Sequence, residues 1–419
     1  MSERRVVITG TGLITSLGDS RQLLHDKLCS GQCGLKMASL FDVPLLKEKR
    51  IVGEITDFDP ANYLGEHNFR PLDRTSQLLI SAAQLALCDS HWTSNMLTSE
   101  TVGLVVGTTF CSLGTISAFD RRALEEGPSC ASPLDFANTV INAASGQTGI
   151  WHNLRGVNST ISSGITSSLE AIAYAAELIR TGQEISILAG GVEDICVESL
   201  LAFQRAGLLV DIGDDQTIPG LFSRNRRGFA LSEGSALVML EELDSALTRG
   251  ATILGEFLGA GSCFDSSIAF VDSEQADAKR SASILSAIES AMHDAGLSPN
   301  QLGSISLGSN GYRFNDRAEV YACQKIIGET HKSVPVTAIK SMLGENMGAS
   351  AAIQIIEAIS YMTEGRMPGV PGVEASHCDL PNCSISHECR TVDVTNCLVS
   401  SVGLDGHCGV VVIGNLRSA

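Results

Sequence analysis

The stretch STISSGITSSLEAIAYAAELIRTG, Ser159–Gly182, starts as a polar turn and continues as a helix that a glycine ends. The N-terminus of a helix carries a partial positive charge, so it stabilises a thiolate or an oxyanion placed there. Yet the stretch contains no cysteine, and neither His nor Asp accompanies its serines. The sequence therefore predicts the support of a nucleophile without the nucleophile itself.

Alternating strands and helices extend from this stretch in both directions. RRVVITGTG, residues 4–12, is predicted to be a strand that ends in a tight turn at its glycines, and TVGLVVGTT, residues 101–109, a buried strand. Apolar residues at helical spacing predict a helix over Leu72–Ser90. A second strand–helix series begins near Ala276, so we expect an α/β protein whose two halves are fused into one body.

Composition excludes several classes of function. The 419 residues carry 29 basic and 47 acidic side chains, and the net charge of −18 argues against a nucleic-acid partner and against docking on an anionic membrane. No run of about 18 apolar residues occurs, and the N-terminal MSERRVVITGTGL lacks the features of a secretion signal. We therefore expect a cytoplasmic protein.

Potential zinc ligands gather near the C-terminus, where Cys378, Cys383 and Cys389 have His377 and His387 beside them. Their spacings fit no standard zinc motif, and the 13 cysteines include no CxxC pair. We therefore expect no metal and no cofactor, and we interpret the cysteines as reduced thiols.

Six segments, in order along nearly the whole chain, resemble the β-ketoacyl-acyl-carrier-protein synthases. They are RVVITGTGLITSLG, ILAGGVED, FSRNRRGFALSEGSALVMLEELDSALTRGA, NDRAEVYACQKIIGE, IKSMLGENMGASAAIQIIEAI and SVGLDGHCGVVV. The resemblance implies a thiolase-like, five-layer αβαβα fold made of two duplicated halves, residues 1–255 and 256–419, and an obligate dimer.

The family's chemistry implies three catalytic positions. A cysteine at a helix N-terminus attacks the acyl thioester, and two histidines support decarboxylation and condensation by stabilising an enolate oxygen. Aligned on the family's motifs, this sequence has Ile165 at the cysteine position, Gly308 at the first histidine position and Glu345 at the second. The resemblance therefore implies that no condensation takes place at this site.

Three polar residues of the same motifs remain, namely Asp316, Glu319 and Lys340. Paired buried charges do no chemistry without a nucleophile, so we interpret these residues as a polar network that holds loops in place.

Other nucleophiles receive little support from the sequence. Several serines lie near Ile165, but none of the nine histidines falls in a motif that would supply a base. His407, Cys111 and Cys408 leave open an acyltransferase or decarboxylase with an unrecognised nucleophile.

Inactive, full-length members of this family act in bacterial type II polyketide systems as chain length factors. Each pairs with an active ketosynthase and shapes the tunnel into which the chain grows, so the resemblance implies three partners: an intact synthase, an acyl carrier protein and a growing polyketide or polyene chain. Gln is the usual replacement for the cysteine in the aromatic group, so Ile165 leaves aryl-polyene pathways open as well. A homodimeric scaffold or acyl-binding protein is the remaining alternative.

The resemblance also places the tunnel. GTTFCSLGTISAFDRRALEEG matches the region that lines the chain-length gate, with Phe110, Ile116 and Phe119 as its bulky side chains. SPLDFANTVINAASGQ matches the segment that reaches the partner's acyl pocket, and its foremost residues are Phe136, Asn138 and Thr139.

Charge predicts where the acyl carrier protein docks. Carrier proteins are acidic, so an acidic subunit attracts them poorly, and we expect docking mainly on the catalytic partner. A basic cluster is expected to make an auxiliary contact at most; it consists of Arg224, Arg226 and Arg227.

Overall fold

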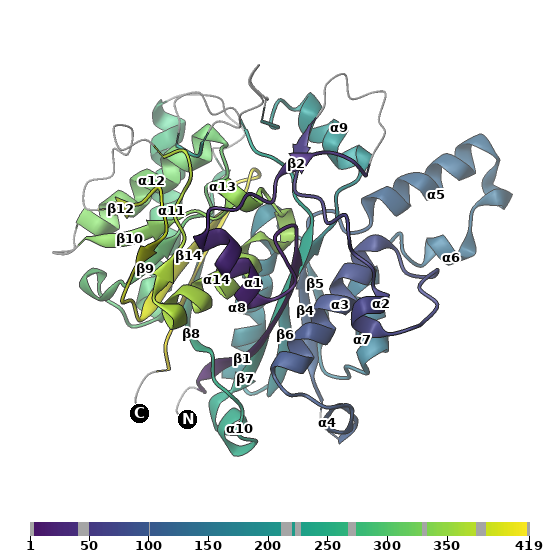
Figure 1. Cartoon of the computed structure of the whole chain (residues 1–419), viewed down its shortest axis with the longest axis horizontal. Coiled ribbons are helices and arrows are strands. Elements are labelled where there is room, and N and C mark those ends of the chain that lie inside the picture. Colours follow the sequence, from purple (N-terminus) through teal and green to yellow (C-terminus); the bar gives the residue numbers. More distant parts are fainter. Residues whose placement is uncertain are drawn as a thin grey trace.

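The computed structural model describes residues 4–40, 50–99, 101–210, 220–222, 228–266, 274–328, 333–373 and 383–416. Its main feature is one large mixed sheet in which two sets of five strands follow the same spatial order (Figure 1). The N-terminal set runs β5–β4–β6–β7–β1 and the C-terminal set β10–β9–β14–β15–β8. This repetition agrees with the expected two duplicated halves.

The strands of the N-terminal set are β1 (Val6–Thr15), β4 (Gly103–Gly107), β5 (Asn158–Ile161), β6 (Ser186–Glu193) and β7 (Gly234–Glu242). Those of the C-terminal set are β8 (Gly255–Phe264), β9 (Ser304–Ser306), β10 (Val334–Thr337), β14 (Asn396–Val402) and β15 (His407–Gly414), and β12 (Cys383–Ile385) extends this set beyond β10. The two sets join where the start of β1 pairs with β8. Two small ladders lie outside the sheet; they pair β2 (Lys36–Met37) with β3 (Ile51–Val52) and β11 (Arg366–Met367) with β13 (Arg390–Thr391).

The two strand sets form two layers, and helices form the other three (Figure 1). On one outer face α3 (Arg74–Asp89) packs on β1 and β7, beside α7 (Ala143–His152). On the other outer face α11 (Glu274–Asp294) packs on β8 and β15, beside α12 (Arg313–Gly328). Between the halves α8 (Ser167–Arg180) and α14 (Ser350–Glu364) contact each other and share the largest buried apolar cluster. The expected five-layer, thiolase-like α/β fold is therefore confirmed.

The remaining helices are short or peripheral. They are α1 (Arg21–Cys29), α2 (Ala61–Leu64), α4 (Ser94–Ser99), α5 (Leu113–Glu125), α6 (Pro133–Phe136), α9 (Val197–Arg205), α10 (Leu243–Thr248) and α13 (Lys340–Leu343), with 3-10 turns η1 (Pro128–Cys130), η2 (Gly164–Thr166), η4 (Pro299–Gln301) and η5 (Met347–Ala349). Among the helices described, none is long and apolar enough to cross a membrane.

The first strand corrects one expectation. The glycines of residues 4–12 do not end it in a turn, because β1 continues to Thr15. A Cβ on Gly12 would lie 2.1 Å from the carbonyl oxygen of Ala82, and one on Gly10 would lie 2.5 Å from Ser90 Cβ. These glycines therefore let α3 pack directly on the strand.

A similar close approach positions the N-terminus of α8. A Cβ on Gly107, at the end of β4, would lie 2.2 Å from the carbonyl carbon of Ser167 and 2.3 Å from the nitrogen of Ser168. On the neighbouring strand β6, a Cβ on Gly191 would lie 2.2 Å from the carbonyl oxygen of Gly348. Both central helices therefore begin against strand ends that carry no side chain.

We expect Gly107→Ala to lower the free energy of unfolding by about 3 kcal/mol, because the new methyl group meets backbone that cannot move alone. Gly146→Ala is the matched control, since a Cβ on this residue of α7 meets nothing within 4 Å. The control is expected to be neutral or stabilising by up to about 1 kcal/mol, as alanine favours helix. Denaturant unfolding of both variants checks this; equal effects would contradict the proposed close packing.

Candidate functional site

Ile165 occupies the turn that leads into α8. It lies in η2 directly before the helix, after Gly164, whose φ of 64° suits glycine. Its side chain is 1% exposed and belongs to a buried apolar cluster with Phe203, Phe229 and Met347. The position expected for a nucleophile therefore holds an aliphatic side chain in closed packing.

The hydroxyl groups of the serines that follow Ile165 form hydrogen bonds with backbone groups. Ser167 Oγ donates to the carbonyl oxygens of Thr108 and Gly164 and accepts from the N–H of Ser163. Ser168 Oγ accepts from the N–H of Ala352, which ties α8 to α14. Within the described residues no imidazole hydrogen-bonds to these hydroxyls, so the geometry offers no activated serine.

Gly308 lies in the loop that follows β9. Its N–H donates to Glu319 Oε1 at 2.8 Å. A Cβ here would lie 2.8 Å from the carbonyl oxygen of Ser400 and 3.1 Å from Ser401 Cα. Any side chain at this position would therefore require the end of β14 to move.

Ser401 links the first two positions. Its Oγ donates to the carbonyl oxygen of Ile165 at 3.3 Å, and its Cα is the atom that crowds Gly308. The structure therefore brings Ile165 and Gly308 to the same place, against the end of β14.

Glu345 is completely buried and accepts four hydrogen bonds. Its Oε2 accepts from Lys340 Nζ at 2.9 Å and from Asn310 Nδ2 at 2.7 Å. Its Oε1 accepts from the N–H of Met347 at 3.0 Å and from the hydroxyl of Ser350. Four donors match the acceptor capacity of a carboxylate, so this group has no free site for a substrate atom.

Two more buried carboxylates shape the loop that carries Gly308. Asp316 accepts from the N–H groups of Asn310 and Gly311. Glu319 accepts from Gly308, Ser309 and Ser400, so it joins α12 to the ends of β9 and β14. Asn310 then connects this loop to Glu345 and Lys340.

The three gate residues lie in two places, Phe110 after β4 and the other two on α5. Phe110 follows β4, is 36% exposed, and packs edge-to-face on Phe203 with ring centroids 5.9 Å apart. Phe203 in turn packs on Phe229, which lies in the cluster of Ile165. Ile116 and Phe119 lie on α5, a helix without buried residues that projects from the body (Figure 1).

The three interface residues differ in exposure. Phe136 is 61% exposed and its ring lies 5.9 Å from that of Phe119, so gate and interface segments touch. Thr139 donates to the carbonyl oxygen of Phe136. Asn138 is buried, and its Nδ2 donates to the carbonyl oxygen of Pro71 at 2.8 Å.

Sequence reasoning missed two carboxylates at the end of β6. Glu193 accepts N–H groups from Thr109, Phe110 and Gly348, which joins the gate to η5. Burial raises its pKa to about 6, although these donors oppose the shift. Burial and the nearby Glu193 raise the pKa of Asp194 to about 8. The GGVED motif carries both residues, but only the fold shows that Glu193 is buried and Asp194 partly buried beside it.

The other candidate nucleophiles lack a base. Cys111 is buried, and burial raises its pKa to about 11. Burial also raises the pKa of Cys408 to about 12. His407 Nδ1 lies 2.9 Å from Asp405 Oδ2, and its ring packs on Phe264.

Two groups of residues lie outside the described part of the chain. These are the basic cluster of Arg224, Arg226 and Arg227, and the His377–Cys378 pair of the possible zinc cluster. Among the residues that are described, no group of three or more metal-ligating side chains occurs.

Comparison with known proteins identifies the family. The model for the beta-ketoacyl synthase N-terminal domain matches residues 3–246, and that for the C-terminal domain matches residues 261–374. The chain therefore belongs to the beta-ketoacyl synthase family.

Particular relatives are of two kinds. The 3-oxoacyl-(acyl-carrier-protein) synthase 2 of Vibrio harveyi is 30% identical over 98% of this chain and 99% of the relative, and its Synechocystis counterpart is 30% identical over 97% of each. Among solved structures, the ishigamide ketosynthase/chain length factor has a TM-score of 0.90 and 26% identity, covering 99% of this chain and 100% of that one. The ketosynthase complex AntDE:AntF, a type II PKS assembly, has a TM-score of 0.88 at 22% identity over 99% and 100%, which shows the shared fold alone.

We expect Lys340→Met to lower the free energy of unfolding by about 3 kcal/mol, because it leaves the buried Glu345 carboxylate without its cation. The double variant Lys340→Met/Glu345→Gln should recover much of this loss. Lys36→Met is the control, since the exposed Lys36 only donates to Thr56 Oγ1. Urea unfolding of the four proteins checks this, and a Lys340→Met midpoint equal to that of the control would contradict it.

Proposed function

We propose that this chain is a chain length factor, a non-catalytic ketosynthase homologue that forms a heterodimer with an active ketosynthase. It shapes the tunnel that receives the polyketide or polyene chain during condensations of malonyl groups bound to an acyl carrier protein. The observation that carries the proposal is the combination of Ile165, Gly308 and Glu345 at the three catalytic positions of a complete ketosynthase fold.

Each replacement removes a chemical step. The aliphatic Ile165 has no atom that could form a thioester with the acyl chain. Gly308 has no side chain, and the Glu345 carboxylate already accepts four hydrogen bonds, so neither residue provides a donor for the oxygen of an enolate. A single replacement could accompany an altered mechanism, but the three together leave no group to carry the condensation.

An exposed apolar surface supports the pairing. In the described residues β5 pairs only with β4, so one edge of the sheet is open to another strand. Large exposed apolar side chains gather in the neighbouring segments, from α5 through α7. They are Leu124, Leu134, Phe136, Val140, Ile141 and Ile150. Large exposed apolar side chains in neighbouring segments are typical of an interface with another subunit.

The gate residues lie next to this surface. Phe119 on α5 contacts Phe136, while Phe110 connects through Phe203 to the buried cluster of Ile165. A partner that covers the surface would enclose Phe110, Ile116 and Phe119 at the boundary between the subunits. Their bulk would then limit how far a chain extends from the partner's active site.

The partners follow from this role. The intact synthase supplies the nucleophile and both histidines, and the acyl carrier protein docks mainly on that subunit because this chain carries a net charge of −18. Such a complex works in the cytoplasm. The pathway class, aromatic or aryl-polyene, depends on the identity of the synthase.

Co-expression with a candidate intact synthase tests the proposal. We expect a one-to-one complex by native mass measurement, and malonyl condensation that requires both chains and disappears when the partner's cysteine is replaced. Ile150→Glu, at a side chain that is 79% exposed, should prevent the complex because it buries a charge. Leu247→Glu on α10 is the control and should leave the complex intact.

Two outcomes would overturn the proposal. A stable homodimer without dependence on a synthase would favour the scaffold or acyl-binding function. Turnover or acyl labelling of this chain alone would favour an acyltransferase or decarboxylase with another nucleophile.

A second test addresses chain length. We expect Phe110→Ala and Phe119→Ala heterodimers to make longer products, because each removes an aromatic ring from the tunnel boundary. Leu247→Ala provides a control at an exposed apolar residue far along the chain from the gate. Mass spectrometry of the products measures the length distribution; distributions equal to that of the control would remove these two residues from the gate.

A further inference from the structure

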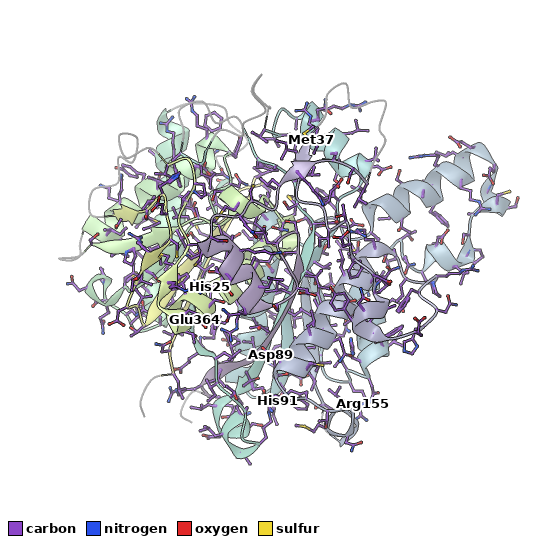
Figure 2. The ribbon with its side chains drawn as sticks, viewed as in Figure 1. His25, Met37, Asp89, His91, Arg155 and Glu364 are labelled. Atoms are coloured by element: carbon purple, nitrogen blue, oxygen red, sulfur yellow. The ribbon has the colours of Figure 1, made fainter. Side chains whose placement is uncertain are left out.

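A second cluster of reactive side chains lies on α1, outside the ketosynthase site. His25 and Cys29 are one helical turn apart, and Cys29 Sγ lies 3.6 Å from His25 Nε2. Figure 2 labels His25 on α1. Its Nδ1 lies 2.7 Å from Glu357 Oε1 on α14. A thiol, an imidazole and a carboxylate therefore form a continuous chain of hydrogen bonds.

The geometry fixes the roles of the two imidazole nitrogens. The Nδ1–H donates to Glu357, so Nε2 of a neutral ring faces the thiol with its lone pair. His25 and Glu357 are almost completely buried, and Glu357 Oε2 has no hydrogen-bond partner. Transfer of the Cys29 proton to His25 would therefore produce an imidazolium that is directly paired with the Glu357 carboxylate. The second oxygen of this carboxylate could still accept a hydrogen bond.

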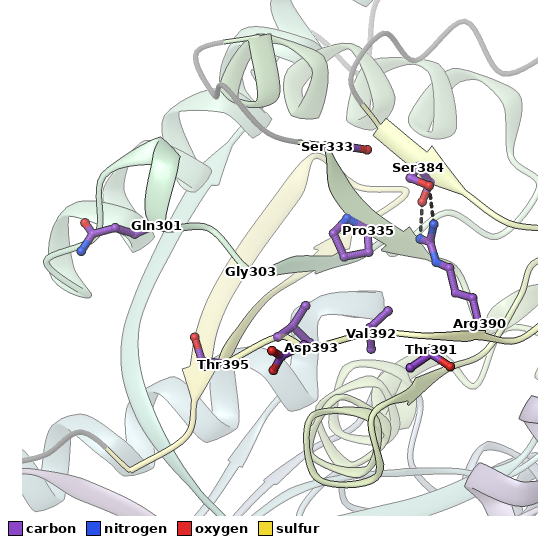
Figure 3. A pocket seen from close by; sticks show the side chains of 11 residues that line it. Gln301, Gly303, Ser333, Pro335, Ser384, Arg390, Thr391, Val392, Asp393 and Thr395 are labelled. Atoms are coloured by element: carbon purple, nitrogen blue, oxygen red, sulfur yellow. Dashed lines mark hydrogen bonds between the residues drawn. The ribbon is translucent and has the colours of Figure 1, made fainter.

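A second thiol lies beside the first. Cys389 and Cys29 line the same cavity although they are far apart in sequence. Cys29 Sγ donates to the carbonyl oxygen of Arg366, and the strand of Arg366, β11, pairs with β13, which begins directly after Cys389. The segment of Cys389 is held by Arg390, which donates to the hydroxyl and carbonyl oxygens of Ser384 and to the carbonyl oxygen of Val336 (Figure 3). Arg390 thus holds the strand that follows Cys389, and Cys389 itself lines a cavity together with Leu28 and Cys29 at the end of α1.

The two thiols open to a cavity of about 470 Å³. Its lining includes Cys29 and Cys389 together with Met342, Pro371 and His387. The space admits a small reagent, whereas the thiols of Cys111, Cys196 and Cys397 are buried in the core.

We propose that Cys29 and Cys389 form a dithiol site that peroxides oxidise to a disulfide, with His25 as the base and Glu357 as the residue that positions it. His25 Nε2 accepts the Cys29 proton, and the thiolate attacks one peroxide oxygen. The O–O bond breaks, the leaving oxygen takes the proton from His25, and Cys29 becomes a sulfenic acid. The Cys389 sulfur then attacks the Cys29 sulfur, the S–O bond breaks and water leaves. In total two thiols and one hydrogen peroxide give one disulfide and two waters.

The surroundings make the base necessary. Burial, and then the neighbouring Cys389, raise the pKa of Cys29 well above that of a free thiol, so the resting site is protonated. Only the direct contact with His25 gives the proton a path away from the sulfur. The inference concerns this cluster alone and does not depend on the proposed function.

A second thiol pair provides a control within the chain. Cys263 and Cys408 face each other on β8 and β15, and Cys408 Sγ donates to the carbonyl oxygen of Cys263. Within the described residues no imidazole hydrogen-bonds to either thiol. If proximity alone were sufficient, both pairs would oxidise alike.

The experiment treats the full chain with hydrogen peroxide, alkylates the remaining thiols and maps the peptides by mass. We expect a Cys29–Cys389 disulfide, seen as linked peptides whose mass is lower by two hydrogens. Cys263 and Cys408 should remain reduced and therefore be alkylated. Cys29→Ser should abolish the cross-link, His25→Gln should slow it by about tenfold or more, and Cys33→Ser should leave it unchanged. In Cys389→Ser, dimedone should trap a sulfenic acid on Cys29, which tests the order of attack without altering His25.

Three results would overturn the proposal. They are equal oxidation of the Cys263–Cys408 pair, a cross-linking rate in folded His25→Gln equal to that of the unaltered chain, and the absence of dimedone labelling at Cys29 in Cys389→Ser. Thermal unfolding of each variant verifies that it is folded before its rate is compared.

Discussion

Glycine backbone near the ends of two strands packs against the residues at which the two central helices start. The architecture of the molecule depends on this close contact. Gly107 and Gly191 allow β4 and β6 to meet α8 and η5 at distances that a single methyl group would prevent. Ile165 owes its position to this contact, and Ser168 and Glu193 carry it further, by hydrogen bonds, to α14 and η5. The frame is that of the beta-ketoacyl synthase family, and Ile165 lies within it directly before α8.

Ile165, Gly308 and Glu345 are each packed or hydrogen-bonded by their neighbours. Ile165 fills an apolar cluster, the backbone of β14 closes around Gly308, and Glu345 has its four donors in place. Restoring a single catalytic side chain would therefore disturb packing or leave charges unpaired. The proposed loss of catalysis is therefore compatible with a well-packed core.

Sequence could supply the class and the duplicated halves, because these depend on local motifs and their order. The assignment of Ile165, Gly308 and Glu345 to the catalytic positions rests on the same motifs and stays a prediction. It could not show that β1 continues past its glycines, since that depends on α3 passing directly above Gly12. It could not show that the side chain of Asn138 is directed to Pro71. The contact between His25 and Glu357 could not be predicted from the sequence either, because 332 positions separate the two residues and no motif includes both.

The projecting α5 has a consequence for the life of the protein in a cell. A helix that buries none of its residues within its own chain receives little stability from packing, and it leaves Leu124 and its neighbours in water. Copies made in excess of whatever covers this arm would present an adhesive, easily cleaved surface to chaperones and proteases. In the proposed heterodimer, the abundance of the folded subunit would then follow the supply of its partner rather than its own rate of synthesis.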